Sequence, residues 1–331
     1  MNPRFDVLGI GLNATDTLIL LEHFPPYAGK VPFGRELLSP GGQVATAVIA
    51  CARLGLSTKY VGTIGDDYKG SLQRQSLEGT GVDISGLIVR ECCPNQTAYI
   101  LIDQQTGERT VLWHRAEPLR LRPDEIHEED IAASRLLHID GYDLEAAAYA
   151  ASVARQNGVS VSVDVDTVYP GFESVLKSVD YLVAGSGWPE KWTGKKDPFQ
   201  ALTQLQQQYG MRVAATTLGH SGALALKDGQ WFYSPGIQVN CVDTTGAGDV
   251  FHGAFCYGVI CGMFIDEALA FSNAAAALNC TAIGARGHLP SVPEIRSLLA
   301  EAETGRVRRL INPEIEEAVA RRTARASAID T

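Results

Sequence analysis

Short apolar runs alternate with amphipathic runs over residues 131–219. The apolar runs are rich in valine, leucine and alanine, and the amphipathic runs repeat their apolar positions at helical spacing. Nearly continuous apolar strands that alternate with helices are typical of a parallel sheet with helices on both faces. The pattern therefore predicts an α/β fold. We expect strands at residues 135–140, 159–165, 180–185 and 211–219, and helices at residues 143–158, 172–178 and 197–210.

Two segments interrupt this alternation. Residues 16–38 combine strand-like residues with prolines, and residues 97–114 alternate on both sides of a Thr106–Gly107 turn, which indicates an antiparallel hairpin. Together they form either a small separate sheet that projects over the main one as a lid, or an edge hairpin of the main sheet. On the first interpretation the chain divides into an α/β core (1–15, 39–96 and 115–310), a β lid (16–38 and 97–114) and a C-terminal helix with a frayed tail (311–331).

Charge and cysteine usage exclude several classes of protein. A formal net charge of −10 argues against a nucleic-acid or anionic-membrane partner, because such surfaces need clustered lysine and arginine. The seven cysteines form no C-x-x-C pair, and their mostly apolar neighbours indicate reduced, buried thiols of a cytoplasmic protein. The N-terminus has no long apolar run, so we expect no signal peptide. Residues 250–265 are too short for a membrane span and predict a buried helix.

The densest candidate chemistry lies at residues 241–255, CVDTTGAGDVFHGAF. The small residues Gly246, Ala247 and Gly248 leave backbone N–H groups unobstructed where an apolar helical pattern begins. Such N–H groups and the helix dipole form an anion hole, able to hold the developing charge of a phosphoryl group. Asp249 follows in the first helical turn, where a carboxylate is stabilised in its ionised form and can accept a hydroxyl proton. Alternatively, Asp249 is only a favourable first-turn acid.

The surroundings of this turn agree with phosphoryl transfer. Residues 232–242 are strand-like and lead into the turn, and Thr244 and Thr245 are suited to cap the helix. The chain contains no G-x-x-x-x-G-K-[ST] loop and no H-E-x-x-H, G-x-S-x-G or kinase H-R-D motif. Transfer by an anion hole and a base, with Mg²⁺ brought by ATP, is compatible with these exclusions.

A second candidate site lies near the N-terminus. Gly9, Gly11 and Ala14 match the G-x-G-x-x-A of a dinucleotide-binding loop, but the residues that follow are strand-like and end in two prolines. An NAD-dependent oxidoreductase is therefore a weak alternative. Asn13 and Asp16 fit better as partners of sugar hydroxyls at the carboxyl end of a strand, although both residue types also form turns.

These stretches together resemble the signatures of one family. DTTGAGDVFHGAF is similar to the C-terminal signature of the ribokinase-like (PfkB-type) carbohydrate kinases. GGQVATAVIACARLG stands where that family has its N-terminal glycine pair, although Gly41 and Gly42 also fit a plain helix-entry turn. VLGIGLNATD resembles the opening strand, and TLGHSGALAL the nucleotide-binding strand pair. The resemblance covers residues 5–300 and implies a central, mostly parallel sheet with helices on both faces and a small β-sheet lid.

The resemblance also implies a role for individual residues. Asp249 would be the general base, and Gly246, Ala247 and Gly248 would form the anion hole. Arg115 is a candidate for meeting an acidic or phosphorylated acceptor, with a plain exposed arginine as the alternative. The remaining assignments are sugar contacts at Asn13, Asp16, Gly42, Gln43 and Thr46, ATP contacts at Thr217, Gly219, Gly222 and Asn273, a monovalent-cation site such as K⁺ at Asp243, Thr245 and Ser291, and a Mg²⁺ contact at Glu190.

Two departures from the family pattern stand out. The family has G-G-x-G-x-N after its opening strand, and this chain has Val44 and Thr46 at the last glycine and the asparagine. The family's N-x-x-E is replaced by GSGWPEKWTG, in which Glu190 lies out of register. These changes predict an unusual acceptor or lower activity, and they leave a catalytically weakened sugar- or nucleotide-binding regulator as an alternative.

The sequence therefore predicts an ATP- and Mg²⁺-dependent kinase. Its substrate would be a hydroxyl of a small sugar or sugar derivative, such as a ketose, a pentose or a sugar acid. Exposed edges of the predicted lid make a homodimer through that sheet a further expectation.

Overall fold

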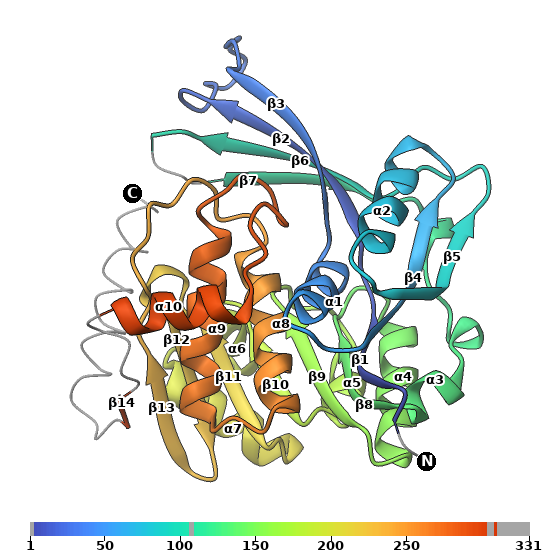
Figure 1. The fold of residues 1–331 in the computed structure, drawn as a ribbon, viewed down its shortest axis with the longest axis vertical. Helices are drawn as coiled ribbons and strands as arrows, with labels where there is room; N and C mark the ends of the chain where they lie inside the picture. Colours follow the sequence, from blue (N-terminus) through green and yellow to red (C-terminus); the bar gives the residue numbers. More distant parts are fainter. Residues whose placement is uncertain (1–2, 106–108, 303–307, 310–331) are drawn as a thin grey trace.

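The computed structural model describes residues 3–105, 109–302 and 308–309. These residues form a ten-stranded sheet, a four-stranded sheet and helices on both faces of the larger sheet (Figure 1). The predicted C-terminal helix and tail at residues 311–331 lie outside the described residues.

The large sheet is mostly parallel, as the alternation of apolar and amphipathic runs predicted. Its strand order is β14-β13-β12-β11-β10-β9-β8-β1-β4-β5, and β12, β13 and β14 pair antiparallel at one edge. The strands are β1 (Phe5–Ile10), β4 (Thr58–Gly65), β5 (Asp83–Arg90), β8 (Ser134–Ile139), β9 (Ser160–Val165), β10 (Tyr181–Ala184), β11 (Val213–Thr217), β12 (Ala223–Lys227), β13 (Gln230–Ser234) and β14 (Arg308–Arg309).

Helices cover both faces of this sheet because alternate strand residues point to opposite faces. In β10, Leu182 packs with one group of helices and Val183 with the other, and both side chains are fully buried. The helices are α1 (Gln43–Arg53), α2 (Tyr68–Glu78), α3 (Glu128–Ala132), α4 (Leu144–Gln156), α5 (Glu173–Leu176), α6 (Trp188–Thr193), α7 (Pro198–Tyr209), α8 (Ala247–Ile260), α9 (Ile265–Asn279) and α10 (Val292–Glu301), with short 3₁₀ turns η1 (Glu117–Leu119), η2 (Pro123–Glu125) and η3 (Gly219–Ser221).

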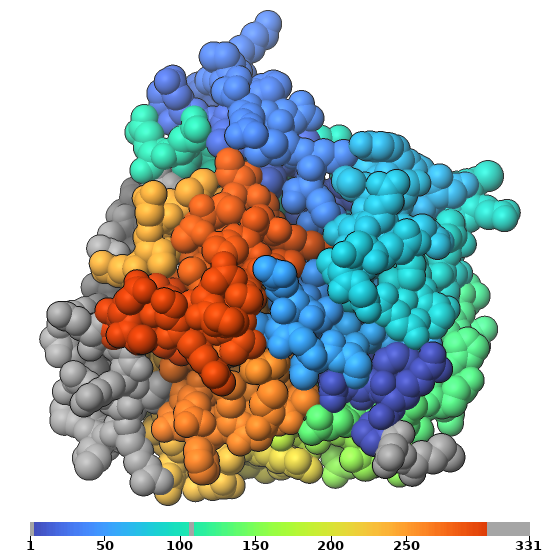
Figure 2. Space-filling view, in the orientation of Figure 1, coloured from blue at the N-terminus to red at the C-terminus, as the bar shows by residue number. Residues whose placement is uncertain are grey.

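The four-stranded sheet is separate from the large one, so the edge-hairpin interpretation is wrong. Its order is β3-β2-β6-β7, and its strands extend beyond the helices of the core (Figure 1). In the space-filling view, blue and teal residues protrude at the top of the molecule (Figure 2). Leu18 and Ile100 are buried on one face of this sheet, while Val111 and Trp113 of the edge strand β7, which lie opposite Ile100 and Ala98, are exposed. A homodimer through this sheet stays a prediction. The strands are β2 (Ala14–Leu21), β3 (Arg35–Gly41), β6 (Thr97–Asp103) and β7 (Arg109–His114).

Two local expectations are corrected. The strand predicted at residues 232–242 ends at Ser234, because Pro235 has no amide to continue the ladder. The buried helix predicted at residues 250–265 is α8, but it ends at Ile260, and Ile265 already begins α9. Within the described residues, no helix has the length and apolar character needed to cross a membrane.

The dinucleotide-like loop at Gly11 leads into strand β2 instead of a helix. A Rossmann site needs a helix N-terminus at this point to bind the pyrophosphate. The fold therefore contradicts the NAD interpretation of this loop.

Candidate active site

Four segments converge where the small sheet meets the core. A Cβ added to Gly41, at the end of β3, would lie 2.3 Å from Asp16 Oδ2 and 3.5 Å from Ala285 Cβ. A Cβ added to Gly246, just before α8, would lie 2.4 Å from the Ala285 carbonyl oxygen. Ala285 thus contacts both glycines, and this brings Asp16 close to the start of α8. The two glycines permit an approach that any side chain would prevent.

The turn before α8 presents open amides, although not the set that the sequence predicted. Gly246 caps the helix with a left-handed φ of 74°. The Ala247 amide donates to the Thr244 carbonyl at 3.2 Å, so this member of the predicted anion hole is already engaged. Among the described residues, the amides of Gly246, Gly248 and Asp249 have no hydrogen-bond acceptor. Within the described part of the chain, a Cβ at Gly248 would meet no neighbouring atom within 4 Å, which leaves space for a ligand above the turn.

The predicted threonine caps do not form, and Asp243 holds the turn instead. Its Oδ1 accepts hydrogen bonds from the Thr245 amide at 2.9 Å and the Thr245 hydroxyl at 2.7 Å. Its Oδ2 accepts from the Gly284 amide at 2.8 Å. Ser291 caps α10, and its hydroxyl bonds Glu294 at 2.5 Å. Both Asp243 oxygens and Ser291 therefore have protein partners, and the monovalent-cation site stays a prediction.

Asp249 stands in the first turn of α8, but its pKa is raised, so its ionised form is disfavoured instead of stabilised as the sequence predicted. Burial and the negative charge of Asp164 raise its pKa to about 7, while His252 and Arg286 oppose this shift. Asp164 Oδ1 lies 3.1 Å from Nε2 of His252. His252 follows Asp249 by about one turn of α8. A carboxylate with a pKa near neutrality is suited to take a proton from a hydroxyl and release it again.

Asp16 is a second carboxylate whose pKa is raised, and its side chain is buried. Burial raises its pKa from about 3.8 to about 7, and the charges of Asp249 and Asp243 add to the shift. Arg286 and Arg109 partly oppose it. The protein therefore holds two carboxylates close together and only partly neutralised, an arrangement that favours binding of hydroxyl donors.

This shift predicts a pH-dependent effect of Asp16→Asn on stability. Because the folded-state pKa lies above the usual value near 3.8, the aspartate destabilises the fold progressively as pH rises from about 3.8 to about 7, and the effect levels off above that. The asparagine does not titrate. We expect the free energy of unfolding of Asp16→Asn, relative to wild type, to increase from pH 4 to pH 8 in urea titrations. A constant difference across this range would contradict the assignment.

The other predicted sugar contacts lie around the N-terminus of α1. Asn13 Nδ2 donates to the Tyr60 hydroxyl at 3.0 Å and to the Thr63 carbonyl at 2.7 Å. Asn13 Oδ1 is buried and has no partner among the described residues. Gly42 has a φ of 97°, and a Cβ there would lie 2.3 Å from Asn13 Cα. Gln43 is half-buried at the first position of α1.

Arg115 is engaged by the core instead of projecting to solvent. Its Nη2 donates to Asp143 at 2.6 Å and to the Leu119 carbonyl at 2.6 Å, and its side chain is only 10% exposed. Its guanidinium also lies over the Tyr142 ring. The exposed-arginine alternative is therefore wrong, and the structure gives this arginine a protein counter-ion.

The four predicted ATP contacts lie around one edge of the large sheet. Thr217 ends β11 and Gly219 begins η3 with a φ of 59°. Gly222 has a φ of 99°, and a Cβ there would lie 2.0 Å from the Ser234 carbonyl oxygen. Asn273 of α9 donates to that same oxygen at 3.0 Å. These residues are thus brought together, and Asn273 ties α9 to the end of β13.

Glu190 lies in the first turn of α6. Its Oε2 is buried and has no hydrogen-bond partner among the described residues. A buried carboxylate oxygen without a partner fits a hydrated Mg²⁺, which prefers oxygen ligands and keeps several waters. No group of three or more candidate ligand side chains occurs in the part of the chain that the structure describes.

Two arginines of the site were not identified from the sequence. Arg109 of β7 donates from Nη1 to the Thr244 hydroxyl at 2.5 Å, which links the small sheet to the turn before α8. Arg286 lies in the loop between α9 and α10, and its charge acts on both Asp16 and Asp249. Arg109 lies in the alternating hairpin segment and Arg286 lies in none of the motifs, but neither setting points to the site, so only the three-dimensional structure connects these arginines with it.

The architecture and the site together define a class of protein. The fold is ribokinase-like, with a mostly parallel sheet, helices on both faces and a small separate sheet. At the junction of the two sheets a carboxylate stands beside open amides at a helix start. That combination is typical of an enzyme that transfers a phosphoryl group to a hydroxyl.

Comparison with known proteins identifies the family. The model of the pfkB family carbohydrate kinases matches residues 14–292, so this chain belongs to that family. The ATP-dependent ribose-1-phosphate kinase of Halopiger xanaduensis is 28% identical over 302 residues, covering 89% of this chain and 98% of that protein. The 5-dehydro-2-deoxygluconokinase of Halalkalibacterium halodurans is 27% identical over 323 residues, covering 91% of this chain and 96% of that protein. Arabidopsis thaliana ribokinase, solved with ribose and ATP, shares the fold at a TM-score of 0.75 and 21% identity, covering 91% of this chain and 100% of that chain.

Proposed function

We propose that this sugar kinase uses ATP and Mg²⁺ to phosphorylate a hydroxyl of a small sugar or sugar derivative, with Asp249 as the general base. One observation carries the proposal: Asp249 follows directly on the open amides of Gly246 and Gly248. An acid and a set of N–H donors in one helical turn are suited to accept a proton and hold a phosphoryl group at the same time.

Each group has a defined task in the proposed mechanism. Asp16 binds acceptor hydroxyls, and Asp249 orients one hydroxyl and takes its proton. The hydroxyl oxygen attacks the γ-phosphorus of ATP in line, the bond to the β-γ bridging oxygen breaks, and ADP leaves. The amides of Gly246, Gly248 and Asp249 hold the charge of the phosphoryl oxygens. Closure of the small sheet, with Arg109 on Thr244, would exclude water from this reaction.

Glu190 would hold Mg²⁺ through its unpartnered Oε2, directly or through a water. When bound, the ion supplies positive charge to the phosphate oxygens. We expect Glu190→Gln to raise the Mg²⁺ concentration needed for half-maximal activity by roughly tenfold, measured in an ADP-release assay. Glu173→Gln removes an exposed acid from the first turn of α5 and is the matched control. Equal Mg²⁺ requirements in both variants would exclude Glu190 from the metal site.

The names of two relatives narrow the class of acceptor to be tested. One is named for ribose-1-phosphate and the other for a deoxygluconate, so their acceptors carry a phosphate or a carboxylate. An ADP-release screen over ketoses, pentoses, nucleosides, sugar phosphates and keto-deoxy sugar acids tests the proposal. Acceptor-dependent ADP release with at least one compound is expected. Ligand binding without turnover across the whole set would instead favour the sugar-binding regulator.

A further inference from the structure

Arg286 is fixed beside the acceptor site by neutral oxygen atoms. Its Nε donates to the Thr46 hydroxyl at 3.1 Å, and its Nη1 donates to the Ser76 hydroxyl at 2.7 Å. Its Nη2 donates to the Gly41 carbonyl at 2.7 Å and to Gln73 Oε1 at 3.4 Å. These bonds occupy four of the five N–H groups of a guanidinium. One N–H of Nη1 therefore stays available for a ligand.

No carboxylate lies within ion-pair distance of Arg286 among the described residues. By contrast, Arg90 lies 2.6 Å from Glu125, and Arg115 lies 2.6 Å from Asp143. Burial lowers the pKa of Arg286 to about 10, which means that the folded protein compensates its charge incompletely. A largely buried cation without a direct counter-ion is costly unless a ligand supplies the anion.

The guanidinium shares its surroundings with the reacting groups. Gly41 accepts a hydrogen bond from Arg286, and its Cα faces the carboxylate of Asp16. Ala285, the residue before Arg286, packs against Gly246 at the start of α8. An acceptor whose hydroxyls reach Asp16 and Asp249 therefore lies within reach of this arginine as well.

Thr46 connects Arg286 with a departure from the family pattern. The family sequence has asparagine at this position, and here the shorter Thr46 accepts a bond from Arg286 Nε. The amide donor lost at Thr46 is thus replaced by a guanidinium. A guanidinium prefers a carboxylate or phosphate over a neutral hydroxyl because its hydrogen bonds to anions are charge-assisted.

We propose that Arg286 binds an anionic group of the acceptor, a carboxylate or a phosphate, and makes this kinase selective for acidic acceptors. This inference rests on the proposed function. The alternative is that Arg286 only balances the negative charges of Asp16 and Asp249. That role affects all acceptors equally, whereas anion binding affects only acceptors that carry the anion.

The test compares kcat/KM for matched pairs of acceptors. One pair is ribose and ribose-1-phosphate. The other is a 2-ketohexose and the acid formed by oxidising its C1 alcohol, which leaves the C6 hydroxyl in both members. For wild type we expect the anionic member of at least one pair to be preferred. Arg286→Met should lower kcat/KM for that anionic acceptor by roughly 10²-fold and for its neutral partner by less than about fivefold. The pair that responds identifies phosphate or carboxylate as the ligand group.

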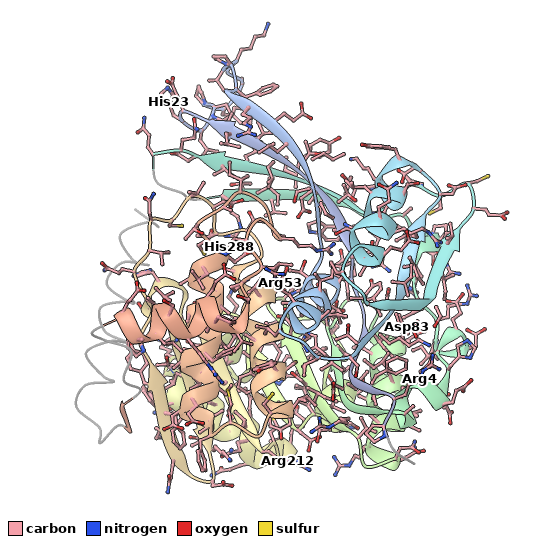
Figure 3. All side chains as sticks on the ribbon, viewed as in Figure 1. Arg4, His23, Arg53, Asp83, Arg212 and His288 are labelled. Atoms are coloured by element: carbon pink, nitrogen blue, oxygen red, sulfur yellow. The ribbon has the colours of Figure 1, made fainter. Side chains whose placement is uncertain are left out.

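Two further variants separate binding from folding. Arg286→Lys keeps the charge but not the forked donors, so it should retain an intermediate preference for the anion. Arg53, labelled in Figure 3, ends α1 and bonds the Leu289 carbonyl of the same loop. Arg53→Met should leave the ratio of the two kcat/KM values unchanged. This ratio does not depend on the fraction of folded enzyme, so a partly unfolded variant remains informative.

The outcomes distinguish the two proposals. Equal losses on both members of each pair in Arg286→Met, or a wild type that prefers neutral acceptors, would overturn the role of Arg286 while leaving the kinase assignment intact. Absence of turnover by wild type with any acceptor would overturn the proposed function, and the inference with it.

Discussion

Asp249→Asn is expected to lower kcat by roughly 10² to 10⁴ while ATP still binds with nearly wild-type affinity. The carboxamide keeps the shape of the side chain but cannot take the proton of the acceptor hydroxyl. Because Asp249 lies in the first turn of α8, the change leaves the buried residues of that helix intact. Steady-state kinetics with a saturating acceptor give kcat, and calorimetric titration with ATP gives the affinity.

A matched variant separates catalysis from helix stability. Asp266 is also a first-turn acid, in α9, and Asp266→Asn removes a charge of the same kind away from the site. If Asp249 were only a favourable first-turn acid, both variants would show a small loss of stability and near-normal turnover. Near-normal kcat in Asp249→Asn would end its assignment as the base.

Gly248→Ala is expected to lower kcat/KM for ATP by at least about tenfold without loss of thermal stability. The new methyl group meets no neighbouring atom of the described residues within 4 Å, and alanine is the better helix former. The methyl group would therefore obstruct only a ligand held by the amides of the turn. Kinetics at varied ATP concentration and a thermal melt measure the two effects.

Gly246→Ala, two residues earlier, is expected to lower the stability of the fold, in contrast to Gly248→Ala. Here the methyl group would lie 2.4 Å from the Ala285 carbonyl oxygen, at a φ of 74° that alanine rarely adopts. We expect a loss of about 2 to 4 kcal/mol in the free energy of unfolding. If Gly248→Ala had normal kinetics, the open space above the turn would not be the phosphoryl site.

The main architecture could be predicted because it is encoded in local patterns. Apolar runs such as residues 159–165 form buried strands, and the prolines in residues 16–38 exclude a crossover helix there. The small-residue turn before Asp249 could be recognised for the same reason, since residues 246–248 are consecutive small residues. The exact amide set could not, because whether the Ala247 amide meets the Thr244 carbonyl depends on the backbone angles of the turn.

The arginines could not be assigned from the sequence because their roles depend on distant contacts. Arg286 bonds Gly41 and Thr46, which precede it by 245 and 240 residues, and no pattern in its own loop indicates this. Arg115 was a candidate for the acceptor, but its pairing with Asp143 became visible only in the folded chain.

The most direct test of the account is to follow transfer of the γ-phosphoryl group of ATP to the acceptor by phosphorus NMR, using the best acceptor from the screen. With wild type, we predict a new phosphomonoester that appears in step with ADP, and with Asp249→Asn we predict almost none over the same time. Equal rates of product formation by the two proteins, or ADP formation without a phosphorylated acceptor, would contradict the account.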